Sequence, residues 1–386
     1  MRIKVSSIIA IIVFSIMFIT LPYFSLYQQV YTPFSVIVIG LYLLLNIKLI
    51  IRKENRTINI LLFLFVLSNI ITLLINKFNF MNLIYFIKII EGFFFFEVIV
   101  SKKQVENVIT LYYKLLLLFV LLSDTLLCFF PSLYVKYHVY LIGNKFYLAY
   151  THILLLVFLL WKNIEKKTLF SLFSFILLLI ISIFISIRID CMTGLIGIIL
   201  YIILIIFRNK NIMYKLTNQN VVIGIFLIFS FLLFIVTNLL ENRFVIQIIK
   251  IFNGDVTLTG RTYIYANLFS LLKKNLMFGV GYGNSHNLIY EAIKAPNTQN
   301  GLFQLVLYFG IVGTLILICI FYHILKINNK NKADRHIILY IIIISVLSMV
   351  EITFDLKAFM IFAIIYAISS EKNINKGEAY ETKKIN

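Results

Sequence analysis

Residues 168–207 read TLFSLFSFILLLIISIFISI-RID-CMTGLIGIILYIILIIF, two long apolar runs joined by a short polar segment. The only charged residues in this stretch are Arg188 and Asp190. An apolar helix of about 20 residues can cross the hydrocarbon core of a membrane, which is about 30 Å thick. The stretch therefore predicts two membrane-spanning helices that meet at Arg188.

The composition of the whole chain supports the same conclusion. Of its 386 residues, 61% are hydrophobic and only 13% are charged, and the mean hydropathy is +0.99. Soluble domains contain about 25% charged residues, and so little polar surface cannot cover a water-exposed globule. A cytosolic enzyme, a secreted domain and a disordered chain are excluded. We predict an all-α polytopic membrane protein in which residues 1–386 form a single integral membrane domain.

Apolar runs of spanning length recur along the sequence. About twelve can be counted, near residues 5–24, 34–51, 58–75, 81–100, 108–130, 146–161, 168–187, 191–207, 220–240, 301–325, 337–354 and 357–370. About twelve transmembrane helices are therefore expected.

The formal net charge of +19 is explained by where the basic residues lie. If the N-terminus is cytoplasmic, clusters of Lys and Arg fall in alternate connections, as the positive-inside bias requires. These clusters lie near residues 52–56, 102–103, 162–167, 208–215 and 326–335. We therefore predict a multi-pass cell-membrane protein with both termini cytoplasmic, residues 371–386 forming a cytoplasmic tail, and no nucleic-acid partner.

One connection is far longer than the others. Residues 241–300, between the ninth and tenth predicted spans, are expected to form a large extracytoplasmic loop, and long loops often carry function. Apolar residues at helical spacing predict a membrane-surface helix from Thr262 to Lys274. The triplet Gly279, Gly281 and Gly283 follows; it either cradles a phosphate group or forms a tight turn beneath that helix, and no long helix is expected after it.

Two arginines are candidates for anion binding. Arg261 lies at the start of the predicted surface helix, where its guanidinium group and free backbone N–H groups can bind the same anion; the alternative is a solvated loop arginine. Arg188 is a charge at the junction of two spans, which is costly unless the charge is paired or functional. Asp190 either forms an ion pair with Arg188 or contributes to substrate binding.

Several short motifs occur in order along the chain. Ser186-Ile-Arg188 leads to Thr193-Gly194; Thr259-Gly260-Arg261 opens the long loop; the glycine triplet at 279–283 precedes Gln299-Asn300-Gly301 and then Gly310 and Gly313. Together they resemble the O-antigen ligase and O-antigen/capsular polysaccharide polymerase superfamily, in its polymerase type.

The resemblance implies an enzyme that joins undecaprenyl-diphosphate-linked oligosaccharide units outside the cytoplasmic membrane. Arg188 and Arg261 match the arginines that hold the diphosphate. Gln299 stands at the position where the family has a histidine, beside Asn300, and an amide cannot act as a base. His286 is the alternative proton acceptor. No paired-carboxylate metal motif occurs on the outer face, so we expect metal-independent transfer and no cofactor.

Two other functions remain open. A ligase of the same superfamily would transfer finished polymer to an acceptor, and a flippase would move lipid-linked oligosaccharides across the bilayer. The flippase should show two similar halves, which the sequence does not. The expected partners are the lipid-linked glycans and the lipid bilayer, together with a chain-length regulator and a separate flippase.

Overall fold

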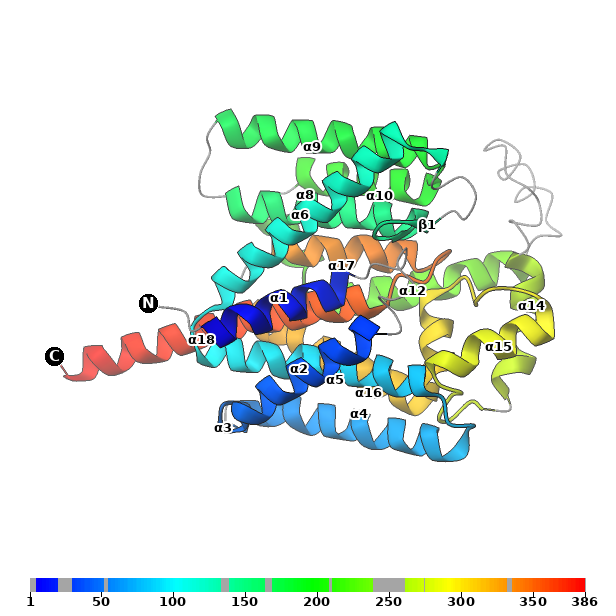
Figure 1. The fold of residues 1–386 in the computed structure, drawn as a ribbon, viewed down its shortest axis with the longest axis horizontal. Helices are drawn as coiled ribbons and strands as arrows, with labels where there is room; N and C mark the ends of the chain where they lie inside the picture. The colour runs from blue at the N-terminus through cyan, green and yellow to red at the C-terminus, as the bar shows by residue number, and fades with distance from the viewer. Residues whose placement is uncertain are drawn as a thin grey trace.

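The computed structural model describes residues 5–19, 30–51, 55–132, 139–163, 169–207, 210–238, 261–273, 275–331 and 335–385. Most of these residues form long helices that run alongside one another (Figure 1). The long helices are α1 (Val5–Ile19), α2 (Thr32–Leu45), α4 (Arg56–Ile75), α5 (Phe80–Ser101), α6 (Val105–Phe129), α8 (Lys145–Asn163), α9 (Leu169–Arg188), α10 (Met192–Ile206), α12 (Gln219–Asn238), α16 (Gly301–Asn331), α17 (His336–Leu347) and α18 (Leu356–Ile385).

The remaining elements are short. Helix α3 (Ile47–Ile50) and helix α11 (Lys210–Leu216) connect longer helices. Strands β1 (Val139–Tyr140) and β2 (Gly143–Asn144) form an antiparallel hairpin directly before α8. Helices α14 (Arg261–Lys273) and α15 (Tyr282–Ile293) precede α16.

Within the described residues, five helices are long and apolar enough to cross a membrane by themselves: α4, α6, α8, α9 and α16. Helices α2, α10, α12 and α17 are also apolar, but their described apolar segments have only 10–17 residues. Large apolar side chains are exposed along α4 and α9, and a soluble protein rarely exposes so extensive an apolar surface. The chain is an all-α polytopic membrane protein.

The last two long helices form the centre of the bundle. Nearly every side chain of α17 is buried, and α18 packs against α5 and α16. A helix that is apolar on all sides is expected in such a position because it has no solvent-facing surface. The sequence was wrong about the end of this span: α17 ends at Leu347 rather than at 354, and residues 348–355 form a turn. The predicted tail is a helical continuation of α18.

A polar cluster connects three helices inside the bundle. The imidazole of His152 on α8 lies 3.3 Å from Asp124 on α6 and 3.3 Å from the hydroxyl group of Ser182 on α9. Buried polar groups need such partners because they have lost their contacts with water. We interpret this cluster as structural, since all three side chains are buried.

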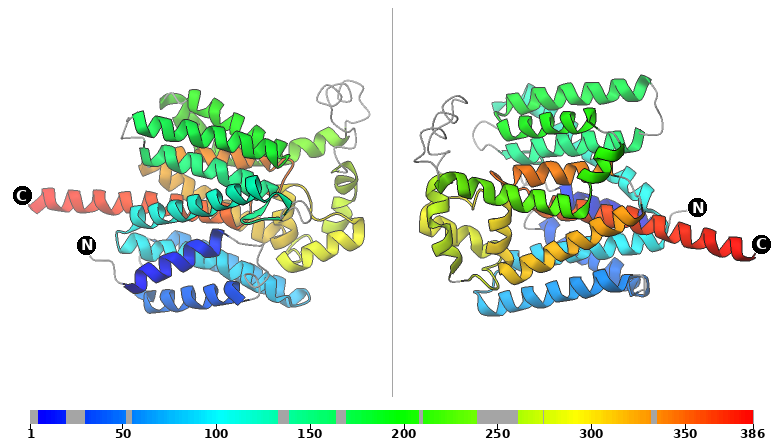
Figure 2. Two further views of the ribbon diagram at one scale, coloured as in Figure 1. Left: turned by 45° about the horizontal axis from the view of Figure 1, so that its top comes forward. Right: turned by 180° about the vertical axis from the view of Figure 1, so that it is seen from behind.

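Helices α14 and α15 lie at one end of the bundle, together with the β-hairpin, whereas the C-terminal half of α18 projects from the opposite end (Figures 1 and 2). Helix α14 confirms the helix predicted from Thr262 to Lys274, and its place on the membrane surface stays a prediction. Helix α15 was not predicted: Gly281 and Tyr282 begin a helix where the sequence suggested only a turn. Residues 241–260 of the predicted outer loop, which include Thr259 and Gly260, lie outside the described residues.

Candidate functional site

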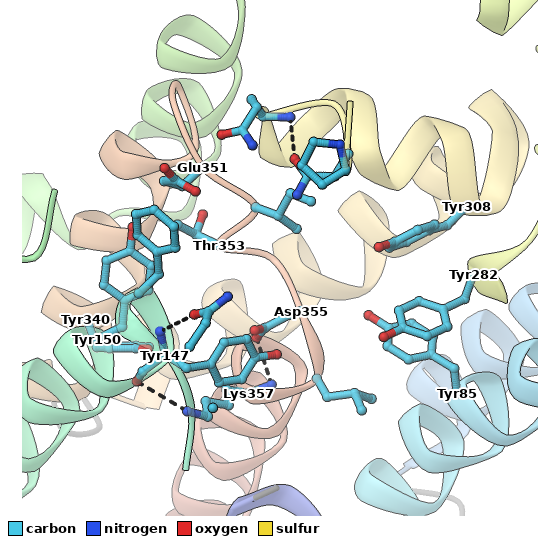
Figure 3. Close-up of a pocket in the computed structure, with 18 residues that line it drawn as sticks. Tyr85, Tyr147, Tyr150, Tyr282, Tyr308, Tyr340, Glu351, Thr353, Asp355 and Lys357 are labelled. Atoms are coloured by element: carbon cyan, nitrogen blue, oxygen red, sulfur yellow. Dashed lines mark hydrogen bonds between the residues drawn. The ribbon is translucent and has the colours of Figure 1, made fainter. Parts of the chain in front are cut away.

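A pocket of about 590 Å³ opens at the end of the bundle that carries α14 and α15 (Figure 3). Its volume is within the range of small-molecule sites. The residues that line it come from β2, α5, α8, α15, α16, α17 and the start of α18, and from the connecting segments that precede α16 and α18. The pocket therefore brings together segments that are far apart in the sequence.

Six tyrosines dominate the lining. Figure 3 shows them as two walls, Tyr85, Tyr282 and Tyr308 on one side and Tyr147, Tyr150 and Tyr340 on the other. In the first wall, the rings of Tyr85 and Tyr282 stack with centroids 3.9 Å apart and an interplanar angle of 7°. The ring of Tyr308 lies 5.2 Å from that of Tyr282. These contacts hold the first wall rigid, because each ring restricts the rotation of the next.

Charged groups lie between and beside the walls. The carboxylate of Asp355 accepts hydrogen bonds from the backbone N–H groups of Lys357, at 2.9 Å, and Ala358, at 3.3 Å, and so caps α18. The ammonium group of Lys357 donates to the hydroxyl of Thr151, at 2.8 Å, and lies over the ring of Tyr147. The start of α18 is thereby fixed to α8.

Asp355 is the most central ionisable group of the pocket. Its carboxylate is hydrogen-bonded to Tyr147 and interacts electrostatically with tyrosines of both walls. Burial raises the pKa of Asp355 above its usual value, although the ammonium group of Lys357 and the hydrogen bonds that the carboxylate accepts act in the opposite direction. Perturbed carboxyl groups inside a pocket are candidates for proton transfer.

Arg188 is not among the residues that line this pocket. Its side chain is exposed at the end of α9, and within the described part of the chain it forms no ion pair with Asp190. The carbonyl oxygen of Asp190 accepts a hydrogen bond from Lys145 at 2.9 Å, and Lys145 directly follows the pocket residue Asn144. The geometry therefore does not support the ion-pair alternative and leaves the side chain of Arg188 exposed at the end of α9.

Arg261 is the first residue of α14, as the sequence predicted for an anion-binding arginine. Helix α14 lies at the same end of the molecule as the end of α9 that carries Arg188 (Figure 1). The orientation of the Arg261 side chain lies outside what the structure describes, so its role stays a prediction.

Backbone hydrogen bonds join residues 276–281, which include Gly279 and Gly281, to α16, and we call this contact the interlock. Gly310 has φ 67° and interrupts α16. The backbone groups freed by this break pair with residues 276–281: Val280 donates to the carbonyl of Leu307 at 2.8 Å, and Gly281 donates to that of Tyr308 at 3.0 Å. In return, the N–H group of Ile311 donates to Leu276 at 2.8 Å. All these bonds join backbone to backbone.

Only glycine fits at the centre of this interlock. A Cβ atom on Gly279 would lie 2.5 Å from the backbone nitrogen of Gly310, and one on Gly281 or Gly283 would collide with an asparagine side chain of the 79–82 segment. The N–H group of Tyr282, at the start of α15, is already bound by Asn82 at 3.1 Å. These contacts support the tight-turn interpretation. Phosphate binding by Gly279, Gly281 and Gly283 stays a prediction.

Gln299 lines the pocket, whereas the neighbouring Asn300 lies in the protein core. Gln299 adopts a left-handed conformation with φ 52° and lines the pocket. Asn300 is fully buried: its side-chain oxygen Oδ1 accepts from the N–H groups of Leu302 and Phe303, and its side-chain Nδ2 donates to the backbone carbonyl of Ser230 at 2.8 Å. Asn300 therefore caps α16 and holds Gln299 in place, and substrate binding by Asn300 stays a prediction.

His286 lies on the exposed face of α15. Its ring stacks on that of Tyr290 with centroids 6.0 Å apart, and it is not among the residues that line the pocket. A role as proton acceptor is not tested by this arrangement and stays a prediction.

Sequence reasoning missed most of the pocket. The tyrosines of the walls are spread over five helices, and no local pattern links them. A signal was present at Glu351 and Asp355, two carboxylates at the predicted outer end of a span, where a charge is costly without a function.

The fold and the pocket define a polytopic membrane protein with an aromatic and polar site at one end of its helical bundle. Residues 191–318 match the family model described as O-antigen ligase, which corresponds to α10 through the first part of α16 and includes Arg261 and Gln299. The match supports the O-antigen ligase and polymerase superfamily, and with it a membrane enzyme that acts on O-antigen polysaccharide, without separating polymerase from ligase. No curated protein and no solved structure matches the chain significantly.

Proposed function

We propose that this protein polymerises undecaprenyl-diphosphate-linked oligosaccharide repeat units into O-antigen or capsular polysaccharide on the outer side of the cell membrane. The observation that carries the proposal is the tyrosine-lined pocket, formed in part by the 282–308 segment that matches the O-antigen ligase family. A pocket at the end of a membrane bundle can receive a glycan from water while its lipid carrier stays in the bilayer.

The proposed orientation follows from charge and fold together. We place α14, α15 and the pocket outside the cell and both termini in the cytoplasm, with about twelve membrane spans. The position of α14 and α15 opposite the projecting end of α18 supports this orientation (Figure 1). The Lys and Arg clusters then lie on the cytoplasmic side.

In the proposed reaction, Arg188 and Arg261 hold the diphosphate of the donor. A polyprenyl diphosphate becomes a good leaving group once its negative charge is balanced, and guanidinium groups can provide this balance through paired hydrogen bonds. The arginines would then act without a metal ion. The exposure of the Arg188 side chain at the end of α9 supports this assignment.

Deletion of the gene tests the proposal against its alternatives. We expect glycans that carry a single repeat unit on their final acceptor, because unpolymerised units can still be transferred. Electrophoresis of the extracted glycans distinguishes the outcomes. Full-length polymer that remains on the lipid carrier would instead indicate a ligase, and repeat units trapped on the cytoplasmic side would indicate a flippase.

A further inference from the structure

The position of Asp355 between two aromatic walls indicates where the acceptor sugar binds and which group takes its proton. This inference rests on the proposed function. We propose that the slot between the tyrosine walls binds the acceptor sugar and that Asp355 takes the proton from its attacking hydroxyl group. The proposal starts from geometry: Figure 3 shows Asp355 between the wall of Tyr282 and Tyr308 and the wall of Tyr147 and Tyr150.

The chemistry of the walls suits a sugar. A sugar ring has apolar C–H faces and polar hydroxyl edges, and tyrosine provides a flat apolar ring that ends in a hydroxyl group. The stacked pair Tyr85 and Tyr282 and the opposite tyrosines can pack against the ring faces, while the hydroxyl groups, Asn297 and Gln299 can hydrogen-bond to its edges. The two opposed walls thus offer apolar ring faces and hydroxyl groups on both sides of the pocket.

The charges of the slot oppose the binding of a diphosphate. It contains two carboxylates, Glu351 and Asp355, and one ammonium group, that of Lys357. The ammonium group is already hydrogen-bonded to Thr151 and lies over the ring of Tyr147. A neutral polyol is therefore preferred inside the slot. Arg188 is exposed and lies outside the pocket lining, and in the proposed reaction it holds the diphosphate, so the donor diphosphate and the acceptor sugar have separate sites.

Asp355 is better placed for proton transfer than the other polar groups of the slot. Its Oδ1 atom accepts hydrogen bonds from the backbone N–H groups at the start of α18, whereas Oδ2 accepts none of these backbone hydrogen bonds, and the hydroxyl group of Tyr147 is hydrogen-bonded to the same carboxylate. A carboxylate fixed through one oxygen can present the other in a constant direction. Gln299 has no basic atom, and Glu351 lies to one side, near Tyr150 (Figure 3).

The proposed step is balanced. The acceptor hydroxyl oxygen attacks the anomeric carbon of the donor, and a new glycosidic C–O bond forms. The bond between that carbon and the diphosphate oxygen breaks, and the lipid diphosphate leaves with the electron pair. The hydroxyl proton moves to Oδ2 of Asp355 and is then released to water. No metal, oxidant or further reactant is needed.

Two substitutions at Asp355 test the proposal. Asp355→Asn and Asp355→Ser both keep a side-chain oxygen that can cap α18, and both remove the base. The probe is the lipid-linked repeat unit extracted from the deletion strain, supplied to the purified full-length protein in detergent. We expect an unchanged melting temperature and a transfer rate lower by about 100-fold or more, the effect of a lost general base. Glu291→Gln on the exposed face of α15 is the matched control and should retain the wild-type rate.

The outcomes separate this inference from the proposed function. If either folded Asp355 variant keeps a rate within about tenfold of wild type, which is below the effect of a general base, the inference is wrong. It is also wrong if His286→Ala or Glu351→Gln shows the full loss while Asp355→Asn does not. If the wild-type protein itself joins no units, the proposed function fails before Asp355 is tested.

Discussion

Replacing Arg188 or Arg261 with alanine is expected to abolish polymer while the protein still folds and inserts. Each guanidinium group is proposed to balance charge on the leaving diphosphate, and removing one such donor lowers transfer about 100-fold or more. Lysine should rescue poorly, because an ammonium group cannot replace a bidentate fork on a phosphate. The measurement is the glycan ladder in a deletion strain that expresses each variant at the wild-type level.

Lys273→Ala is the matched control, because Lys273 is an exposed cation at the other end of α14. Its loss should leave the ladder unchanged. A full ladder with Arg261→Ala would make that residue a solvated loop arginine, and a full ladder with Arg188→Ala would show that Arg188 does not hold the diphosphate.

Replacing Gly310 or Gly279 with alanine is expected to prevent correct folding. At Gly310, a Cβ atom would collide with the backbone carbonyl of Met277, and both glycines have positive φ angles. The left-handed conformation costs about 1–2 kcal/mol for other residues, and overpacking adds about 1–3 kcal/mol. Neighbouring backbone cannot move away as a flexible side chain could. The yield and the melting temperature of detergent-extracted protein measure the effect.

Gly224→Ala provides the comparison. Gly224 also lies in a long helix, α12, but a Cβ atom there would have no neighbour within 4 Å. This variant should give wild-type yield and melting temperature. If Gly310→Ala behaved in the same way, the interlock between α16 and residues 276–281 would not be essential to the fold.

The fold could be predicted where the information is local. Apolar runs located the long helices, since each must satisfy its own backbone in a membrane, and helical periodicity located α14. The same reasoning missed α15, because its residues are only moderately apolar and its start depends on Asn82 and on the break in α16. The end of α17 was missed because the apolar sequence continues through Met349 and Val350 into the turn.

The site was harder to predict than the fold. Gln299, which the motifs singled out, lines the pocket, whereas the roles predicted for the other motif residues stay predictions. From the sequence alone, a packing role of Gly279 or Asn300 could not be distinguished from a role in substrate binding, because contacts with a distant backbone segment cannot be recognised in a short motif. The same holds for Asp355: its position between Tyr147 and Tyr282 depends on the association of α8, α15 and the turn before α18.

The most direct measurement is polymerisation by the purified protein. Lipid-linked repeat units extracted from the deletion strain are incubated with the full chain in detergent and excess EDTA, and the products are separated on a gel. We predict a ladder of lipid-linked polymers, with one undecaprenyl diphosphate released for each new linkage and the same rate with or without EDTA. Units that remain single under all conditions, or that join only after a divalent metal is added, would contradict metal-independent polymerisation by this protein.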